Sequence, residues 1–70
     1  MKVYVIVQDG VERMVAARSK AEAAHALAIG LSTFARKGAE VGDESTVAVA
    51  NSEPGAVFCR PVGAIQWSLE

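Results

Sequence analysis

The stretch VYVIVQDGVERMVAARSKAE, residues 3–22, decides the fold, because it holds a β-hairpin and the start of a helix with almost no linker. Residues 2–8 are mostly β-branched or aromatic, which favours an extended chain. Asp9-Gly10 is typical of a type I′ turn, which needs positive φ at both central positions. A strand over residues 11–17 then returns antiparallel. A two-residue loop sets the register, in which Gln8 pairs with Val11, Ile6 with Arg13 and Tyr4 with Val15.

Both faces of this hairpin are substantially apolar, although one helix can cover only one of them. The first face carries Val3, Val5, Val7, Met14 and Ala16, and the second carries Tyr4, Ile6, Val11 and Val15 with Gln8 and Arg13. We expect the helix to cover the first face, because Gln8 and Arg13 would be costly to bury without partners. The second face would then be partly exposed and form an apolar patch around Tyr4, Ile6 and Val15.

A single helix is predicted over residues 20–37. Ser19 is a favourable N-cap, and Glu22, three residues later, completes a capping box. Gly38 supplies a stop directly after two basic residues in the last turn. Gly30 falls inside this helix, where glycine costs about 1 kcal/mol relative to alanine.

The second half of the chain predicts further strands. In order, the expected elements are a polar loop at 39–45, a weakly alternating strand at 46–51, a type II turn at 53–56, and strands at 57–60 and 64–68. The predicted fold is α+β in one domain, residues 1–70. It is an antiparallel β-sheet of four to five strands in the order β-β-α-β-β, with one helix packed on one face.

Charge is distributed unevenly along the chain. The net charge is −1, yet residues 1–38 hold six Lys and Arg against three Asp and Glu, whereas residues 39–70 hold one Arg against five acidic residues. Nucleic-acid-binding domains are usually strongly basic in total, so no direct nucleic-acid contact is expected. The acidic half indicates either a basic partner or solvated loops.

The residues needed for catalysis or metal binding are scarce. His25 is the only histidine and Cys59 the only cysteine, and no metal-ligand spacing is present. We therefore expect no enzyme, no metal and no cofactor. The single cysteine and the absence of a long apolar run favour a cytoplasmic protein without a membrane segment. Leu69-Glu70 matches the residues that a cloning site leaves before a lost tag, so the pair adds nothing to the fold predicted from the sequence.

The run VYVIVQDGVERMVAARSKAEAAHALA, residues 3–28, resembles the openings of many very small proteins of phages and other mobile elements. In these, two short strands, a Ser-x-x-(Glu/Gln) cap and an alanine-rich helix recur. The size and compact α+β plan resemble small anti-CRISPR proteins that act on type I systems, with type I-C as the suggested subtype. The resemblance implies a non-enzymatic inhibitor that binds a subunit of the Cascade surveillance complex and blocks target DNA recognition, in the cytoplasm of an infected or carrier bacterium.

An inhibitor of this kind suggests an acidic binding edge, because surfaces that hold DNA phosphates are lined with Lys and Arg. If the two loops that carry them lie side by side, Glu40, Asp43, Glu44 and Glu53 would form that edge. Tyr4, Phe58 and Trp67 are candidate anchors if they are exposed, and the basic face at Arg13 is the second choice of surface. We expect a monomer, with a homodimer as the alternative. Other open functions are a phage regulatory or accessory protein that binds a different host protein, and a weak nucleic-acid-binding module.

Overall fold

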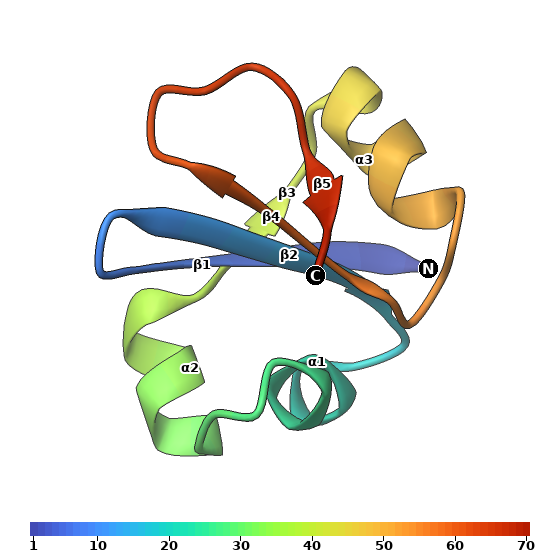
Figure 1. Cartoon of the computed structure of the whole chain (residues 1–70). Helices are drawn as coiled ribbons and strands as arrows, with labels where there is room; N and C mark the ends of the chain where they lie inside the picture. Colours follow the sequence, from blue (N-terminus) through green and yellow to red (C-terminus); the bar gives the residue numbers. More distant parts are fainter.

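The computed structural model describes all 70 residues and shows a five-stranded antiparallel sheet with three helices (Figure 1). The sheet order is β3-β1-β2-β4-β5, so the N-terminal hairpin lies at its centre. The α+β fold with an antiparallel sheet is therefore confirmed, but the expectation of a single helix is wrong. The elements in chain order are β1 (Lys2–Gln8), β2 (Val11–Ala17), α1 (Lys20–Ala26), α2 (Leu31–Lys37), β3 (Ala39–Val41), α3 (Glu44–Asn51), β4 (Val57–Pro61) and β5 (Ser68–Leu69).

The hairpin of β1 and β2 forms as predicted. Asp9 and Gly10 have φ of 53° and 76°, the positive pair that a type I′ turn requires. The strands pair in the expected register, with Gln8 opposite Val11, Ile6 opposite Arg13 and Tyr4 opposite Val15. The register therefore follows from the loop length alone.

The helical segment is broken in two, which corrects the expectation of one helix over residues 20–37. Ser19 caps α1 through a 3.1 Å bond from the Glu22 amide, which confirms the predicted N-cap. The Glu22 side chain accepts a 3.3 Å bond from the Arg18 amide, not from the Ser19 amide that a capping box requires. The chain leaves α1 after Leu27, passes through the left-handed region at Ala28 (φ 59°), and starts α2 with Gly30 as its N-cap. Gly30 thus lies at a helix boundary, where it does not carry the helix-interior cost.

The segment 46–51, expected to be a strand, belongs instead to helix α3. Asp43 caps this helix by accepting a 3.1 Å bond from the Thr46 amide. This local side-chain cap outweighs the β-propensity of Thr46 and of the valines that follow it. Residues 39–41, expected to be part of a loop, form the short edge strand β3 against β1.

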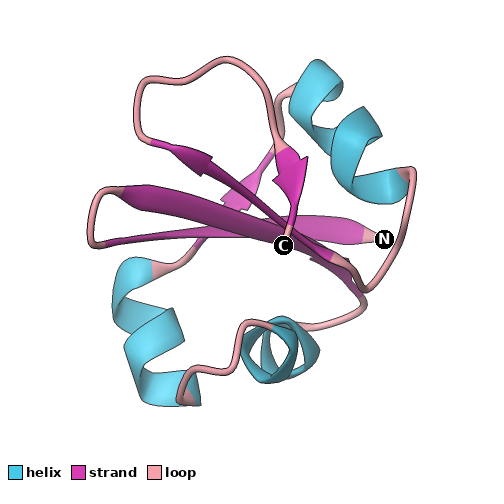
Figure 2. Ribbon diagram, in the orientation of Figure 1, coloured by secondary structure: helices cyan, strands magenta, loops and turns pink.

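The helices cover both faces of the sheet, and α1 and α2 lie on the face opposite to the one expected (Figures 1 and 2). The core between the sheet and the helices α1 and α2 consists of Tyr4, Ile6, Val15, Ala17, Ala23, Ala24, Leu27 and Phe34. The core between the sheet and α3 consists of Val3, Met14, Ala16, Ala50 and Phe58. The expected exposed patch at Tyr4, Ile6 and Val15 does not exist, because these side chains are 3%, 1% and 0% exposed.

Arg13 explains why its face tolerates burial. Its guanidinium donates a 2.9 Å bond from Nη1 to the carbonyl oxygen of Leu27 at the end of α1, and its other nitrogens meet the carboxylate of Glu70. A cation at a helix C-terminus also interacts favourably with the helix dipole. The expectation that Arg13 would keep the helix off this face is therefore wrong, because the Leu27 carbonyl and Glu70 are its partners.

Candidate functional site

An open groove lies between the first turns of α3 and the connection from β4 to β5. Its volume is about 490 Å³. The connection rises from the sheet on the same side as α3, so the two elements form the walls of the groove (Figure 1). The lining residues are Asp43, Ser45, Thr46 and Val49 from α3 and its cap, with Arg60, Ala64, Ile65 and Trp67 from β4 and the connection.

Arg60 supports the connection wall. Its guanidinium carbon lies 4.2 Å from the ring centroid of Trp67, which is a cation–π contact. Its Nε donates a 3.1 Å bond to the carboxylate of Glu12, and its Nη1 donates a 3.3 Å bond to the carbonyl oxygen of Ile65. Arg60 therefore fixes the indole and the connection while its own charge is balanced by Glu12.

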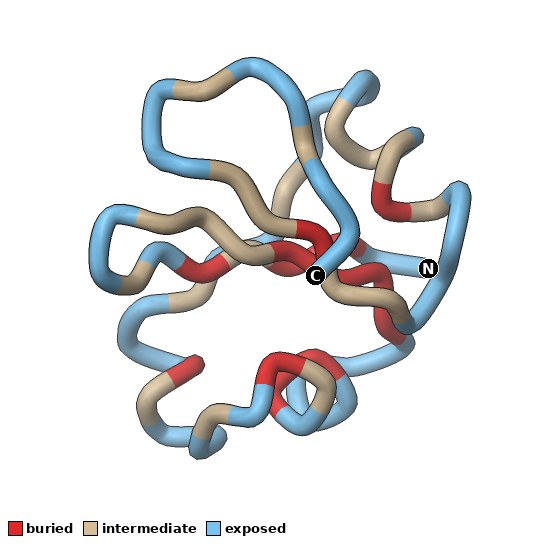
Figure 3. The backbone as a smooth tube through the Cα atoms, viewed as in Figure 1, coloured by how far each residue is buried: buried red, intermediate tan, exposed pale blue.

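The connection exposes large apolar side chains. Ile65 is 89% exposed and Val62 is 57% exposed. A turn closed by a 3.0 Å bond from the Ala64 amide to the Pro61 carbonyl lifts this segment away from the sheet. Figure 3 shows that most of the connection is exposed or only half-buried. Isolated exposed apolar residues are common, but these two lie within the same short segment as Trp67 and Arg60.

Asp43 places a carboxylate on the α3 wall. Its Oδ2 accepts bonds from the Thr46 amide at 3.1 Å and from the Ser45 and Thr46 hydroxyls, each at 2.8 Å. These bonds, the Thr46 hydroxyl first, hold the pKa of Asp43 below its usual value. Because all three bonds fall on Oδ2, Oδ1 is free for another donor.

The predicted anchors are divided among three places. Tyr4 and Phe58 are buried, and they lie on opposite faces of the sheet. Trp67 is half-buried and lines the groove. Arg13 donates hydrogen bonds to the Leu27 carbonyl and the Glu70 carboxylate on the face that α1 and α2 cover. Trp67 is thus the only predicted anchor with surface in the groove.

The predicted acidic edge is not continuous. Glu40 lies on β3, 3.8 Å from the Lys2 amine, while Asp43 and Glu44 lie at the start of α3. Glu53 follows the other end of α3, which is roughly 12 Å long at about 1.5 Å per residue. The two loops expected to be neighbours are therefore separated by a helix that the sequence interpretation did not include.

Arg60 and Ile65 were not among the predicted site residues. Pro61 and Gly63 indicated an interruption after β4, and an interruption of a strand commonly marks a surface loop. The expected strand over residues 64–68 is nevertheless wrong, because only Ser68–Leu69 form β5 and Ile65 lies on the exposed connection before it. The Arg60–Trp67 stacking depends on β4 and β5 pairing, which the sequence did not specify.

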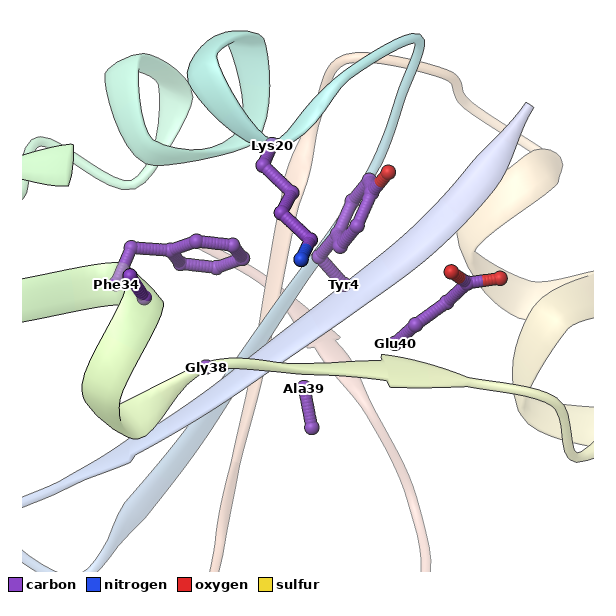
Figure 4. A pocket seen from close by; sticks show the side chains of 7 residues that line it. Tyr4, Lys20, Phe34, Gly38, Ala39 and Glu40 are labelled. Carbon is purple, nitrogen blue, oxygen red and sulfur yellow. The ribbon is translucent and has the colours of Figure 1, made fainter. Parts of the chain in front are cut away.

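A second, smaller cavity of about 120 Å³ lies on the other face of the sheet. Figure 4 shows the side chain of Lys20 extending from the start of α1 toward the space between the rings of Phe34 and Tyr4. The remaining lining residues are Ala35, Gly38, Ala39 and Glu40. This cavity brings one amine and one carboxylate near an aromatic pair, without a nucleophile or an acid–base pair in contact.

No group of three His, Cys, Asp or Glu side chains is arranged to hold a metal ion. None of the three helices has the length and apolar character to cross a bilayer. Comparison with protein-family models, with curated proteins and with solved structures found no match for this chain.

Proposed function

We propose that this chain acts by binding another protein through the β4–β5 connection and the adjoining groove. The observation that carries the proposal is Ile65, a large apolar side chain that is 89% exposed beside a Trp–Arg pair. Trp and Arg are the residue types that most often dominate the energy of protein interfaces. Removal of Ile65 and Val62 from water by a partner would add a hydrophobic contribution.

The rigid placement of these groups supports the same function. Arg60 holds Trp67 through the cation–π contact and holds Ile65 through its carbonyl oxygen. A contact surface that is already ordered loses less conformational entropy when a partner binds. The pair therefore favours a preformed binding surface over a loop that orders on contact.

The partner that we propose is a subunit of the Cascade complex of a type I CRISPR system, so that binding prevents recognition of target DNA. The resemblance of residues 3–28 to small anti-CRISPR proteins supports this choice of partner. The proposed role is non-enzymatic, since inhibition requires only occupation of a surface that Cascade needs.

The test uses purified type I-C Cascade and a labelled duplex with its target sequence. Wild-type protein is expected to bind Cascade and to reduce duplex binding in proportion to its concentration. Ile65→Asp is expected to weaken binding to Cascade at least about tenfold, because it places a charge at the centre of an apolar contact. Leu31→Asp is the matched control: Leu31 is 55% exposed at the start of α2, on the opposite face of the sheet.

Three outcomes are informative. Equal loss from Ile65→Asp and Leu31→Asp would contradict the assignment of the surface. Absence of any binding to Cascade at micromolar concentration would contradict the choice of partner. A shift of duplex or single-stranded DNA by the chain alone would contradict protein binding and support the nucleic-acid alternative.

A further inference from the structure

We propose that the groove between α3 and the β4–β5 connection receives a Lys or Arg side chain of the partner. This inference rests on the proposed function, in which the groove is part of the contact surface. It goes further by naming the chemistry of the group that enters. The partner residue would place its aliphatic stem on the apolar walls and its cationic head at Asp43.

The apolar part of the site suits a long side chain. Val49 on α3 and Ala64, Ile65 and Trp67 on the opposite wall line one continuous groove of about 490 Å³. Long basic side chains bury their methylene stems along such surfaces while the charged head remains at a polar end. A short polar side chain would leave these walls in contact with water.

Charge decides which head group fits. The structure contains three ion pairs, which join Lys2 to Glu40, Arg13 to Glu70 and Arg60 to Glu12. The carboxylates of Asp43 and Glu44 take part in none of them, and both are exposed at the start of α3. The one cation in the groove, Arg60, is balanced by Glu12. Arg60 is close enough to attract the Asp43 carboxylate, but its ion pair is with Glu12. Asp43 therefore offers a carboxylate without an ion pair at one end of the groove, and its Oδ1 has no hydrogen-bond donor.

An anionic ligand is the opposing possibility, because Arg60 and the N-terminus of α3 both favour negative charge. The contacts of Asp43 and Arg60 argue against it. Asp43 already occupies the helix cap with its own carboxylate, and Arg60 is engaged by Glu12, the Ile65 carbonyl and the Trp67 ring. An anion would have to lie beside the charge of Asp43, with only Nη2 of Arg60 left to donate a hydrogen bond to it.

The test compares three small probes of matched shape by titration into ¹⁵N-labelled protein at pH 7. The probes are n-butylguanidinium as the cation, N-butylurea as its neutral isostere, and pentanoate as the anion. We expect butylguanidinium to shift the amides of Thr46, Val49 and Ile65 and the indole N–H of Trp67. Its dissociation constant should be at least about threefold lower than that of butylurea, and pentanoate should leave these signals unshifted.

Two variants localise the preference. Asp43→Asn keeps a good N-cap residue but removes the charge, so it should equalise the affinities of butylguanidinium and butylurea. Glu53→Gln removes a carboxylate that is also exposed but lies beyond the far end of α3, and it should leave the preference unchanged. The spectra report directly whether each variant is folded.

Each contrary result overturns the inference. Tighter binding of pentanoate would show an anion site at Arg60, equal binding of butylurea would show an apolar site without charge selection, and no shifts would show no site. The Cascade experiment is independent, since it depends on Ile65. A cation preference without Cascade binding would disprove the proposed function alone. Cascade binding without a cation preference would disprove this inference alone.

Discussion

The ring of Phe34 on α2 meets the ring of Tyr4 on β1 edge to face, with centroids 5.7 Å apart and planes inclined by 71°. Such pairs add about 0.5–1.5 kcal/mol to the effect of burial alone. Phe34 is 2% exposed and is the only buried residue of α2. This contact therefore carries most of the attachment of α2 to the sheet.

Replacement of Phe34 by leucine should lower the free energy of unfolding by about 1–2 kcal/mol, because the aromatic contact is lost and a small cavity remains. Urea denaturation at neutral pH measures the change. Tyr4→Phe keeps both rings and should change the free energy by less than about 0.5 kcal/mol. A larger effect from Tyr4→Phe than from Phe34→Leu would contradict this arrangement.

Gly38 is required because there is no space for a side chain between α2 and β3. A Cβ at this position would lie 2.6 Å from Cε1 and 2.8 Å from the carbonyl oxygen of Phe34. Gly38→Ala should destabilise the fold by about 1–3 kcal/mol through this overlap. Gly42→Ala is the matched control, since a Cβ there has no neighbour within 4 Å. Equal thermal midpoints for the two variants would show that the overlap is relieved.

Ala28 is strained, because its φ of 59° lies in the left-handed region that residues with a Cβ avoid. Ala28→Gly should therefore stabilise the protein by about 0.5 kcal/mol, after allowance for the greater freedom of glycine in the unfolded chain. Ala48→Gly, in the middle of α3, should instead destabilise it by about 0.5–1 kcal/mol. Chemical denaturation of both variants gives the signs, and a loss of stability in Ala28→Gly would contradict the strain.

The cap of α3 predicts a pH dependence of stability. The pKa of Asp43 is lowered in the native state by its bonds from Thr46 and Ser45. A lowered native pKa means that the unfolded chain takes up the proton first. The contribution is therefore present above about pH 4, the usual range for an aspartate, and is lost as the pH falls through the native pKa. The urea midpoint of the wild type should fall in acid more steeply than that of Asp43→Asn. A difference between the two that stays constant from pH 7 to pH 2.5 would contradict this prediction.

The parts of the fold that were predictable from sequence are those set by neighbouring residues. Asp9-Gly10 determined a turn and a register, and Ser19 with Glu22 determined where α1 begins. The signal for α3 was also local, since Asp43 precedes Thr46 at cap spacing. It was overlooked because the alternation of valine and alanine after Thr46 also fits a strand.

The remaining errors have long-range causes. The choice of face for α1 depended on a partner for Arg13, and that partner is the Leu27 carbonyl, which is available only because α1 ends there. The break at Ala28 has no glycine or proline at the strained residue itself, so propensity did not reveal it. Likewise the groove requires α3 and the β4–β5 connection to stand on the same face, which depends on the whole topology.

The presence of a buried core on each face of the sheet changes what defines the hairpin. In most sheets a slip of one residue would turn the apolar face toward water. The alternation of polar and apolar residues therefore fixes the register of the strands. Here both faces are covered. A slip of β1 against β2 would only exchange the residues that pack against α1 and α2 with those that pack against α3. The apolar pattern therefore does little to specify the register of β1 against β2. The Asp9-Gly10 turn specifies it, and so decides which residues enter each core.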